Sequence, residues 1–282
     1  MKVLVVGASS FIGLRLYGQL RDDPDMDVVG TYFEHQKDPG FLHLDITDPE
    51  ELEQVLAQVR PEAVYWVAGS KNLKKCEADP EYARRINTYP VMELLRILAQ
   101  LGLRPHVVFV STDYVFDGER GRYAAGDAPR PKTQYGQSNL WAEQCLQASP
   151  FPCSIVRTSA VMGRHGTFFD WLTHALGQNQ PIDLFADVYF SPTPIGRLVM
   201  CFQRIVAQRR LGILHVCGNQ RLSRYEFAIA LKALRPRFVA ELVPAAADAS
   251  QLLFQKDLSL VPSDVCQPFA NLTIFEELAG EL

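Results

Sequence analysis

The amino-acid sequence predicts an α/β fold, namely a doubly wound parallel sheet followed by a small carboxy-terminal domain. Apolar runs of strand length alternate with amphipathic helical patterns, as a parallel sheet with helices on both faces requires. A glycine-containing turn joins the first strand to the first helix, and beyond about Arg157 the alternation loosens. We therefore expect one domain over residues 1–160 and a second mainly over 161–282, with parts of the second returning to the sheet.

Capping signals and apolar periodicity define the elements of the first domain. The first helix follows Ser9 or Ser10, and Asp48 caps a helix whose first turn holds Pro49 and Glu51. We expect strands at Val3–Val6, Asp27–Tyr32, Phe41–Leu44, Ala63–Val67, His106–Val110 and Cys153–Val156, and further helices at Phe11–Leu20, Pro80–Leu101 and Tyr135–Gln147.

The second domain has weaker signals. Helices are expected at Phe168–Leu176 and Ile195–Ala207, and a strand at Ile213–Val216. Ser223 and Glu226 form a capping box for a helix that runs to about Leu234. The alanine-rich stretch 245–249 is expected to be a surface loop.

Composition excludes several classes of protein. The chain has 282 residues, of which 48% are hydrophobic and 21% charged, as in ordinary globular proteins. A net charge of −4 argues against nucleic acid or an anionic membrane as a partner. The 6 cysteines and 6 histidines are scattered, so we expect no metal site and free thiols in a reducing compartment. Without a signal or membrane-spanning pattern, a cytoplasmic protein is expected.

The turn Gly7-Ala-Ser-Ser-Phe-Ile-Gly13 predicts a dinucleotide site, because it lies between the first strand and the first helix. Gly7 permits the tight turn, and Gly13 lets the helix pack closely on the strand. The helix amino terminus then offers N–H groups to a pyrophosphate. Ser10 takes the middle position of the usual glycine triad, where its hydroxyl can donate to phosphate. The alternative is a strand–helix turn without a ligand.

Residues after the second and third strands are candidates for the adenosine end of the cofactor. Glu34 lies 21 residues beyond Gly13, where a carboxylate can accept from a ribose hydroxyl and so favour NAD. His35 and Lys37 could instead serve the 2′-phosphate of NADP, and a solvated loop is a further alternative. Asp45 and Ile46 could flank the adenine, or simply form a loop that leads into a helix.

Thr112 and Tyr135 are the candidate chemical pair. Thr112 lies at the end of a strand, at the sheet edge where open α/β sheets bind ligands, and its hydroxyl can orient a carbonyl. Tyr135 can protonate the carbonyl oxygen during hydride transfer. A cation one helical turn later would lower the pKa of the phenol, but Asn139 stands there. Asn139 can still bind the nicotinamide ribose, without a charge.

Lysines after the fourth strand offer a replacement for that cation. Lys71, Lys74 and Lys75 follow the strand on the ligand-binding edge of the sheet. Lys71 is the candidate that could approach Tyr135, and a solvated lysine-rich loop is the alternative.

Several motifs together resemble the extended short-chain dehydrogenase/reductases, above all their branch of dTDP-4-dehydrorhamnose reductases and the related regulatory β-subunit of methionine adenosyltransferase. The Ser-Thr-Asp-Tyr-Val-Phe-Asp-Gly block at 111–118 is the motif specific to that branch. The resemblance spans about residues 1–235. It also rests on the turn at 7–13, Leu-Asp-Ile at 44–46, Cys76-Glu77 with Asp79-Pro80, Asn87, Tyr135-Gly136 with Glu143, and Val-Arg-Thr-Ser at 156–159.

The resemblance implies a Rossmann domain, a carboxy-terminal substrate domain, NAD or NADP as cofactor and a nucleotide-sugar ketone as substrate; it allows a homodimer. Thr112 and Tyr135 would be catalytic, together with Asn139 at the lysine position. Asp113, Tyr114 and Arg157 would border the substrate, although Arg157 could instead form a structural ion pair. The expected cofactor contacts are Gly7, Ser9, Ser10, Phe11, Ile12, Gly13, Glu34, Asp45, Ile46, Ala68 and Gly69.

Departures from the family pattern fall at the cofactor. Ser10 replaces a glycine, Asn139 replaces the lysine, and Gly69-Ser70 replaces a pair of alanines. Gln267-Pro268 stands where this branch often has an arginine and a proline, which weakens any role there in binding the sugar pyrophosphate.

Three functions remain open from the sequence. The first is an NAD(P)H-dependent reductase of a nucleotide-activated 4-keto-sugar. The second is a catalytically weak or inactive homologue that binds dinucleotide and acts as a regulatory or scaffold subunit. The third is a different reaction on the same scaffold.

Overall fold

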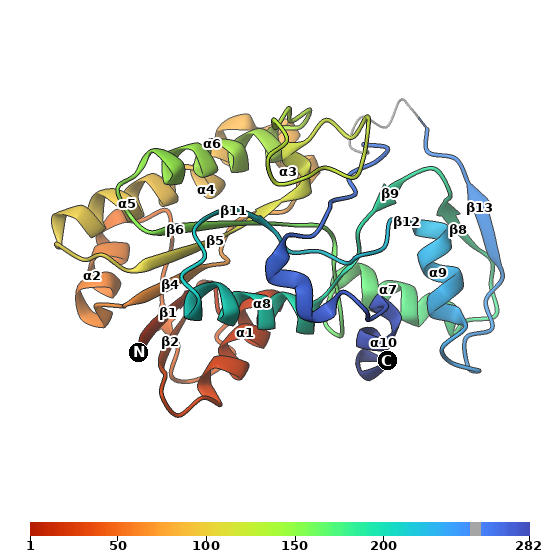
Figure 1. Cartoon of the computed structure of the whole chain (residues 1–282), viewed down its shortest axis with the longest axis horizontal. Helices are drawn as coiled ribbons and strands as arrows, with labels where there is room; N and C mark the ends of the chain where they lie inside the picture. The colour runs from red at the N-terminus through yellow and green to blue at the C-terminus, as the bar shows by residue number, and fades with distance from the viewer. Residues whose placement is uncertain (249–254) are drawn as a thin grey trace. The chain divides into compact units, whose positions relative to one another are not determined.

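The computed structural model describes residues 1–248 and 255–282, which form two compact units (Figure 1). Each unit is assembled from more than one stretch of the chain. Val199–Leu214 belongs to the first unit and Phe116–Arg130 to the second. The first unit is completed by Met1–Val115 and Pro131–Arg157, and the second by Thr158–Leu198 and His215–Leu282.

A seven-stranded sheet organises the first unit, and its strand order is β11-β6-β5-β4-β1-β2-β3. The pairs β1–β2, β1–β4, β4–β5 and β2–β3 are all parallel. The order 3-2-1-4-5-6 is that of a doubly wound Rossmann sheet, so the predicted fold class is confirmed. The strands are β1 (Lys2–Val6), β2 (Asp27–Tyr32), β3 (Leu42–His43), β4 (Ala63–Trp66), β5 (His106–Thr112), β6 (Cys153–Thr158) and β11 (Gly212–His215).

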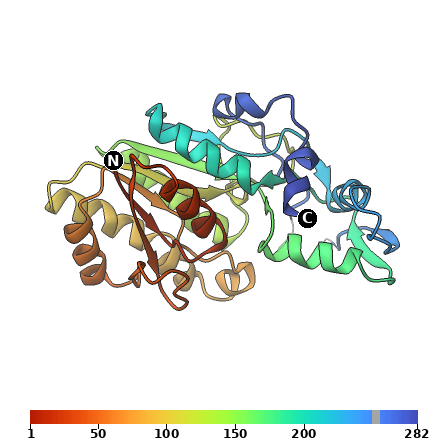
Figure 2. The same cartoon turned by 90° about the horizontal axis from the view of Figure 1, so that it is seen from below.

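Helices cover both faces of this sheet (Figures 1 and 2). On one face α1 (Phe11–Arg21) and α8 (Ile195–Ala207) lie side by side, and Gln19 donates a side-chain hydrogen bond to Gln203 at 2.8 Å. On the other face lie α2 (Pro49–Val59), α5 (Tyr89–Gln100) and α6 (Gln134–Ala148).

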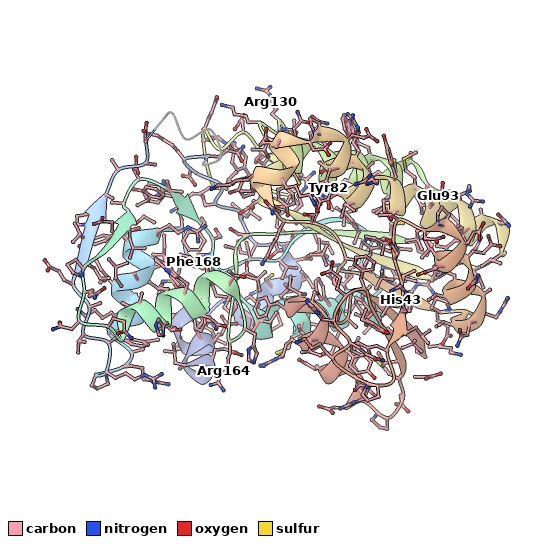
Figure 3. All side chains as sticks on the ribbon, turned by 180° about the vertical axis from the view of Figure 1, so that it is seen from behind. His43, Tyr82, Glu93, Arg130, Arg164 and Phe168 are labelled. Carbon is pink, nitrogen blue, oxygen red and sulfur yellow. The ribbon has the colours of Figure 1, made fainter. Side chains whose placement is uncertain are left out.

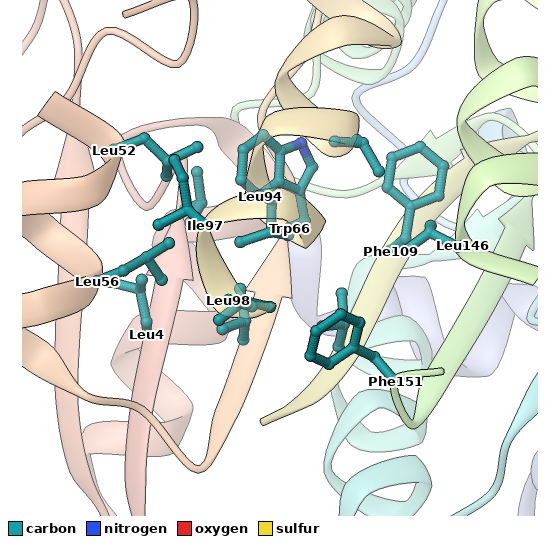
Figure 4. Close-up of a cluster of buried hydrophobic side chains, with 14 of the residues drawn as sticks. Leu4, Leu52, Leu56, Trp66, Leu94, Ile97, Leu98, Phe109, Leu146 and Phe151 are labelled. Atoms are coloured by element: carbon teal, nitrogen blue, oxygen red, sulfur yellow. The ribbon is translucent and has the colours of Figure 1, made fainter. Parts of the chain in front are cut away.

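One core cluster of the first unit lies between the sheet and the second of these helical layers (Figure 4). The apolar faces of α2 and α5 pack against side chains of β1, β4 and β5, because each helix repeats its apolar residues every three or four positions. The cluster includes Leu4, Leu52, Leu56, Trp66, Leu94, Ile97, Leu98 and Phe109.

The long helix expected over Pro80–Leu101 is two helices, α4 (Pro80–Asn87) and α5. The break falls at Thr88, because Pro90 has no N–H to donate and its ring clashes with the carbonyl four residues earlier. The break places Asn87 at the end of α4, where its side chain is buried. A short helix, α3 (Leu73–Ala78), was not predicted.

The second unit packs short strand pairs against helices around its own core. The pairs are β7 (Val161–Met162) with β10 (Thr193–Pro194), β8 (Ile182–Phe185) with β13 (Leu242–Ala245), and β9 (Tyr189–Phe190) with β12 (Leu222–Ser223). Its helices include α7 (Thr167–Leu176), α9 (Arg224–Lys232) and α10 (Ile274–Leu278).

Several expectations for this unit can be compared with the structure, and the helix expected at Phe168–Leu176 is observed as α7. The predicted capping box at the start of α9 is confirmed, since Ser223 and Glu226 bond each other's backbone N–H groups. The predicted alanine-rich loop begins inside β13, and Ala249 lies outside the described residues. Within 1–248 and 255–282, no helix is long and apolar enough to cross a bilayer.

Candidate active site

The candidate site lies at the carboxyl edge of the sheet in the first unit. Gly7 follows β1, Ala68 lies just beyond β4, and Thr112 ends β5. The direction of winding reverses between β1 and β4, and open α/β sheets bind ligands at such a switch point. The glycine turn and the candidate chemical pair therefore belong to the same edge.

The steric roles predicted for Gly7 and Gly13 agree with the geometry of the turn. Gly7 has a φ of +86°, and a Cβ added there would lie 3.0 Å from the backbone of Ala68. A Cβ on Gly13 would lie 2.2 Å from the carbonyl oxygen of Gly7. Any larger residue at position 13 would push α1 away from β1.

Ser10 is the amino-terminal cap of α1. Its hydroxyl oxygen accepts a hydrogen bond from the N–H of Gly13 at 3.1 Å. The N–H of Ser9 donates to the Thr31 carbonyl at 3.3 Å and thereby ties the turn to β2. In the described part of the chain the N–H groups of Phe11 and Ile12 have no hydrogen-bond partner. These two groups and the Ser10 hydroxyl hydrogen can bind an anion at the positive end of the helix.

The residues expected at the adenosine end differ in whether their side chains already form hydrogen bonds or packing contacts within the protein. Glu34 is exposed just beyond β2 and forms no hydrogen bond or ion pair with the described residues. The Asp45 carboxylate accepts from the N–H and the hydroxyl of Thr47, each at 2.8 Å. Ile46 packs against the core of the first unit. Glu34 is thus the available carboxylate, and Asp45 mainly shapes the turn into α2.

The loop after β4 is held by Asn87. The Asn87 carbonyl oxygen accepts from the N–H of Ser70 at 2.8 Å, and its amide donates to the Ser70 carbonyl at 3.2 Å and to the Ser138 hydroxyl at 3.1 Å. A Cβ on Gly69 would lie 3.0 Å from the side-chain carbonyl oxygen of Asn87. Tyr82, marked in Figure 3, donates to the Ser70 hydroxyl at 3.1 Å. Asn87 therefore links the expected cofactor loop to α6.

Thr112 and Tyr135, predicted to converge, are near neighbours, and the Thr112 side chain lowers the pKa of the Tyr135 phenol. The Thr112 hydroxyl also donates to the Asp113 carboxylate at 3.2 Å and accepts from the N–H of Tyr114 at 3.2 Å. The rings of Tyr114 and Tyr135 meet edge to face, with centroids 5.6 Å apart. The structure thus brings together four residues of the predicted catalytic and substrate set.

The environment of Tyr135 keeps its phenol protonated. The pKa of Tyr135 is raised to about 12, chiefly by burial and to a smaller extent by the negative charge of Asp113, while Thr112 lowers it. No cation of the described residues is among these causes. Lys71 is exposed, and the idea that it supplies the missing cation finds no support here.

Asn139 directs its side chain to the backbone and not to the phenol. Its amide donates to the carbonyl oxygen of Tyr135 at 2.9 Å, and the Ser138 hydroxyl donates to the same oxygen at 2.9 Å. Asn139 is buried. A cofactor role for its remaining amide oxygen stays a prediction.

Arg157 forms the structural ion pair that was the alternative to a substrate role. Its guanidinium donates to both oxygens of the Glu143 carboxylate, at 3.0, 3.2 and 2.6 Å, and both side chains are fully buried. The Ser111 hydroxyl donates to the same carboxylate at 2.5 Å. A contact between Arg157 and the substrate stays a prediction.

Sequence reasoning assigned no role to Asn87, Gly136, Ser138 or Glu143. Asn87, Gly136 and Glu143 were noticed only as parts of motifs. Pro90 is the sequence feature that could have indicated Asn87. A proline three residues later ends the preceding helix, and the last side chain of that helix can then face the neighbouring loop. For Glu143 the signal was its spacing of eight residues from Tyr135, which places both on one helix face.

Residues 1–252 match the family model described as RmlD substrate binding domain. The chain is 31% identical, over 238 residues, to a probable dTDP-4,6-dihydroxy-2-methyloxan-3-one 4-ketoreductase of Streptomyces antibioticus, with 81% of this chain and 75% of the relative covered. It is 23% identical, over 248 residues, to methionine adenosyltransferase 2 subunit beta of Rattus norvegicus, with 82% and 71% covered.

The fold matches a solved structure over nearly its whole length. This is dTDP-4-dehydrorhamnose reductase from Bacillus anthracis, determined in complex with NADP. The two chains superpose with a TM-score of 0.85 at 23% identity, and the match covers 99% of this chain and 98% of the other.

Proposed function

The chain belongs to the RmlD substrate binding domain family, and we propose that it is an NAD(P)H-dependent reductase of a nucleotide-activated 4-keto-sugar. The observation that carries this proposal is the position of the Tyr135 phenol, in ring contact with Tyr114 and near Thr112, at the ligand-binding edge of the sheet that also holds the glycine turn. The names of the Streptomyces and Bacillus relatives support both the reaction and the class of substrate.

The residues of the turn fit a dinucleotide. The N–H groups of Phe11 and Ile12 and the hydroxyl of Ser10 would bind the pyrophosphate, while Gly7 and Gly13 keep the loop tight. Glu34 would accept from a ribose hydroxyl, which favours NAD, whereas the Bacillus relative was determined with NADP. Asp45, Ile46, Ala68 and Gly69 would line the rest of the cofactor, which supplies the hydride.

Thr112 and Tyr135 would act on the substrate carbonyl. The Thr112 hydroxyl, turned from Asp113, donates to the carbonyl oxygen and holds it beside the phenol. As the carbon receives the hydride, the oxygen becomes an alkoxide and takes the proton of Tyr135. A phenol with a pKa of about 12 can make this transfer, because an alkoxide is a stronger base than a phenolate. The phenolate then regains a proton from water.

Nicotinamide fluorescence tests the proposal. The protein is first titrated with NADH and NADPH, and a dTDP-4-keto-sugar is then added. We expect binding followed by oxidation of the cofactor. Tyr135→Phe and Thr112→Val should each lose the oxidation while they retain cofactor binding. Undiminished turnover in Tyr135→Phe would refute the assignment of Tyr135 as the acid.

A second function is favoured by one observation, namely that no cation lowers the pKa of Tyr135 within the described residues. A weak or inactive homologue that binds dinucleotide would then act as a regulatory or scaffold subunit, and the Rattus norvegicus relative is named as a subunit. Cofactor binding without oxidation, across a panel of nucleotide keto-sugars, would support this second function over the first.

A further inference from the structure

We propose that Gly136 and Glu143 are positioning residues, which clamp α6 to the end of β5 at two points and so hold Tyr135 against Thr112. The inference rests on the proposed function, because it concerns the same chemical pair. All the residues involved belong to the first unit.

The first point is a backbone contact at the start of α6. A Cβ added to Gly136 would lie 2.1 Å from the carbonyl oxygen of Tyr114 and 3.1 Å from the Cβ of Pro131. Tyr114 belongs to η1 (Asp113–Val115), the single turn that follows β5. Glycine alone therefore lets the helix reach this turn. Because Tyr135 precedes Gly136 directly, this approach brings its ring to the edge of the Tyr114 ring.

The second point is the carboxylate of Glu143, two helical turns beyond Tyr135. Tyr135, Asn139 and Glu143 are spaced by four residues and share the face of α6 that points to the sheet. Glu143 accepts from Ser111, the residue just before Thr112, and from Arg157 in β6. The carboxylate thus fixes α6 to the two strands that flank its face.

Two separated contacts restrict the position and rotation of α6 more than a single contact can. Gly136 sets the distance between α6 and η1, and Glu143 sets the rotation and sliding of the helix along the sheet. Because Asn139 brings no charge, Thr112 is the neighbour that lowers the pKa of Tyr135. A shift of Tyr135 away from Thr112 by about 1 Å can cost about a hundredfold in rate.

Gly136→Ala tests the first point, with Gly18→Ala as the matched control. Both substitutions add one methyl group to a helix, but a Cβ on Gly18 meets no atom within 4 Å. We expect Gly136→Ala to lower kcat about a hundredfold while the Kd of the cofactor is unchanged. Gly18→Ala should match the parent protein in both. A Gly136→Ala protein with the parent kcat would overturn the proposal.

A readout that needs no turnover separates this inference from the proposed function. In protein labelled with ¹³C at tyrosine Cζ, the Tyr135 resonance is identified by its loss in Tyr135→Phe. Thr112→Val should shift this resonance in the parent, because it removes the hydroxyl that lies near the phenol and lowers its pKa. In Gly136→Ala, where Tyr135 is separated from Thr112, the added Thr112→Val substitution should leave the Tyr135 resonance unshifted. An equal shift in both backgrounds contradicts the clamp, even if no keto-sugar is reduced.

Ser111→Ala keeps the inference testable if Gly136→Ala does not fold. It removes one hydrogen bond to Glu143 and leaves the Arg157–Glu143 ion pair. We expect a lower kcat, an unchanged cofactor Kd and a smaller Thr112→Val shift of the Tyr135 resonance. If Ser111→Ala leaves both kcat and that shift at the parent values, Glu143 does not position Tyr135.

Discussion

The side-chain amide of Asn139 donates a hydrogen bond to the backbone carbonyl of Tyr135, 2.9 Å away. Asn139 thus shares a helix face with the phenol but contributes no charge to it. Burial then determines the pKa of Tyr135 and raises it to about 12. The predictions below follow from this environment and from the contacts around it.

Asn139→Lys should increase the rate of keto-sugar reduction at neutral pH. An ammonium group beside the phenol favours its ionised form and lowers the pKa of Tyr135, which makes it a stronger acid. Each unit of pKa corresponds to about 1.4 kcal/mol. Steady-state kcat measures the effect, and Asn139→Met controls for side-chain length without charge. Equal rates for the two variants would show that charge at position 139 is not the limiting factor.

Ser10→Ala and Ser10→Gly should both weaken cofactor binding, and Ser10→Ala should also destabilise the fold more than Ser10→Gly. Loss of the cap costs about 1 kcal/mol with alanine, but only a few tenths with glycine. Both variants lose the hydroxyl that we expect to donate to the pyrophosphate, so both should show a higher cofactor Kd. Chemical denaturation and fluorescence titration measure the two effects. Were Ser10→Gly to bind as tightly as the parent, the hydroxyl would have no role at the phosphate.

Removal of one partner of the Glu143–Arg157 pair should be strongly destabilising. Arg157→Met leaves a buried, uncompensated carboxylate, and we expect a loss of about 3–5 kcal/mol of unfolding free energy. The double variant Glu143→Leu/Arg157→Met should recover most of this loss. Urea unfolding of the parent, Arg157→Met, Glu143→Leu and the double variant measures it. If the double variant is no more stable than Arg157→Met, the ion pair itself contributes the lost unfolding free energy.

Stability should fall as the pH rises above 10, and Tyr65 should be one cause. Burial raises the pKa of Tyr65, whose hydroxyl donates to the Phe202 carbonyl at 3.3 Å. The unfolded chain ionises this phenol near pH 10, whereas the folded chain resists ionisation, so stability is lost above that pH. Tyr65→Phe should reduce the loss between pH 10 and 11, as measured by urea midpoints. The same change at the exposed Tyr89 should leave it unaltered.

The order of elements in the first unit follows from local sequence. Asp48 with Pro49 and Glu51, and the strand Asp27–Tyr32, are recognisable because capping bonds and apolar periodicity involve only neighbouring residues. The break at Thr88 was missed, since the apolar face appears continuous across Pro90. Helix α3 was missed as well, because at six residues it is too short to show a period.

The sequence by itself determined the parallel sheet, the glycine turn and the residue types of the chemical pair. Tertiary structure alone decided that Arg157 pairs with Glu143 and that Asn87 holds the loop after β4. The physical reason is the separation along the chain of the residues that interact. Helix caps and periodicity arise within a few residues along the chain, whereas burial, ion pairing and pKa depend on side chains that only folding brings together.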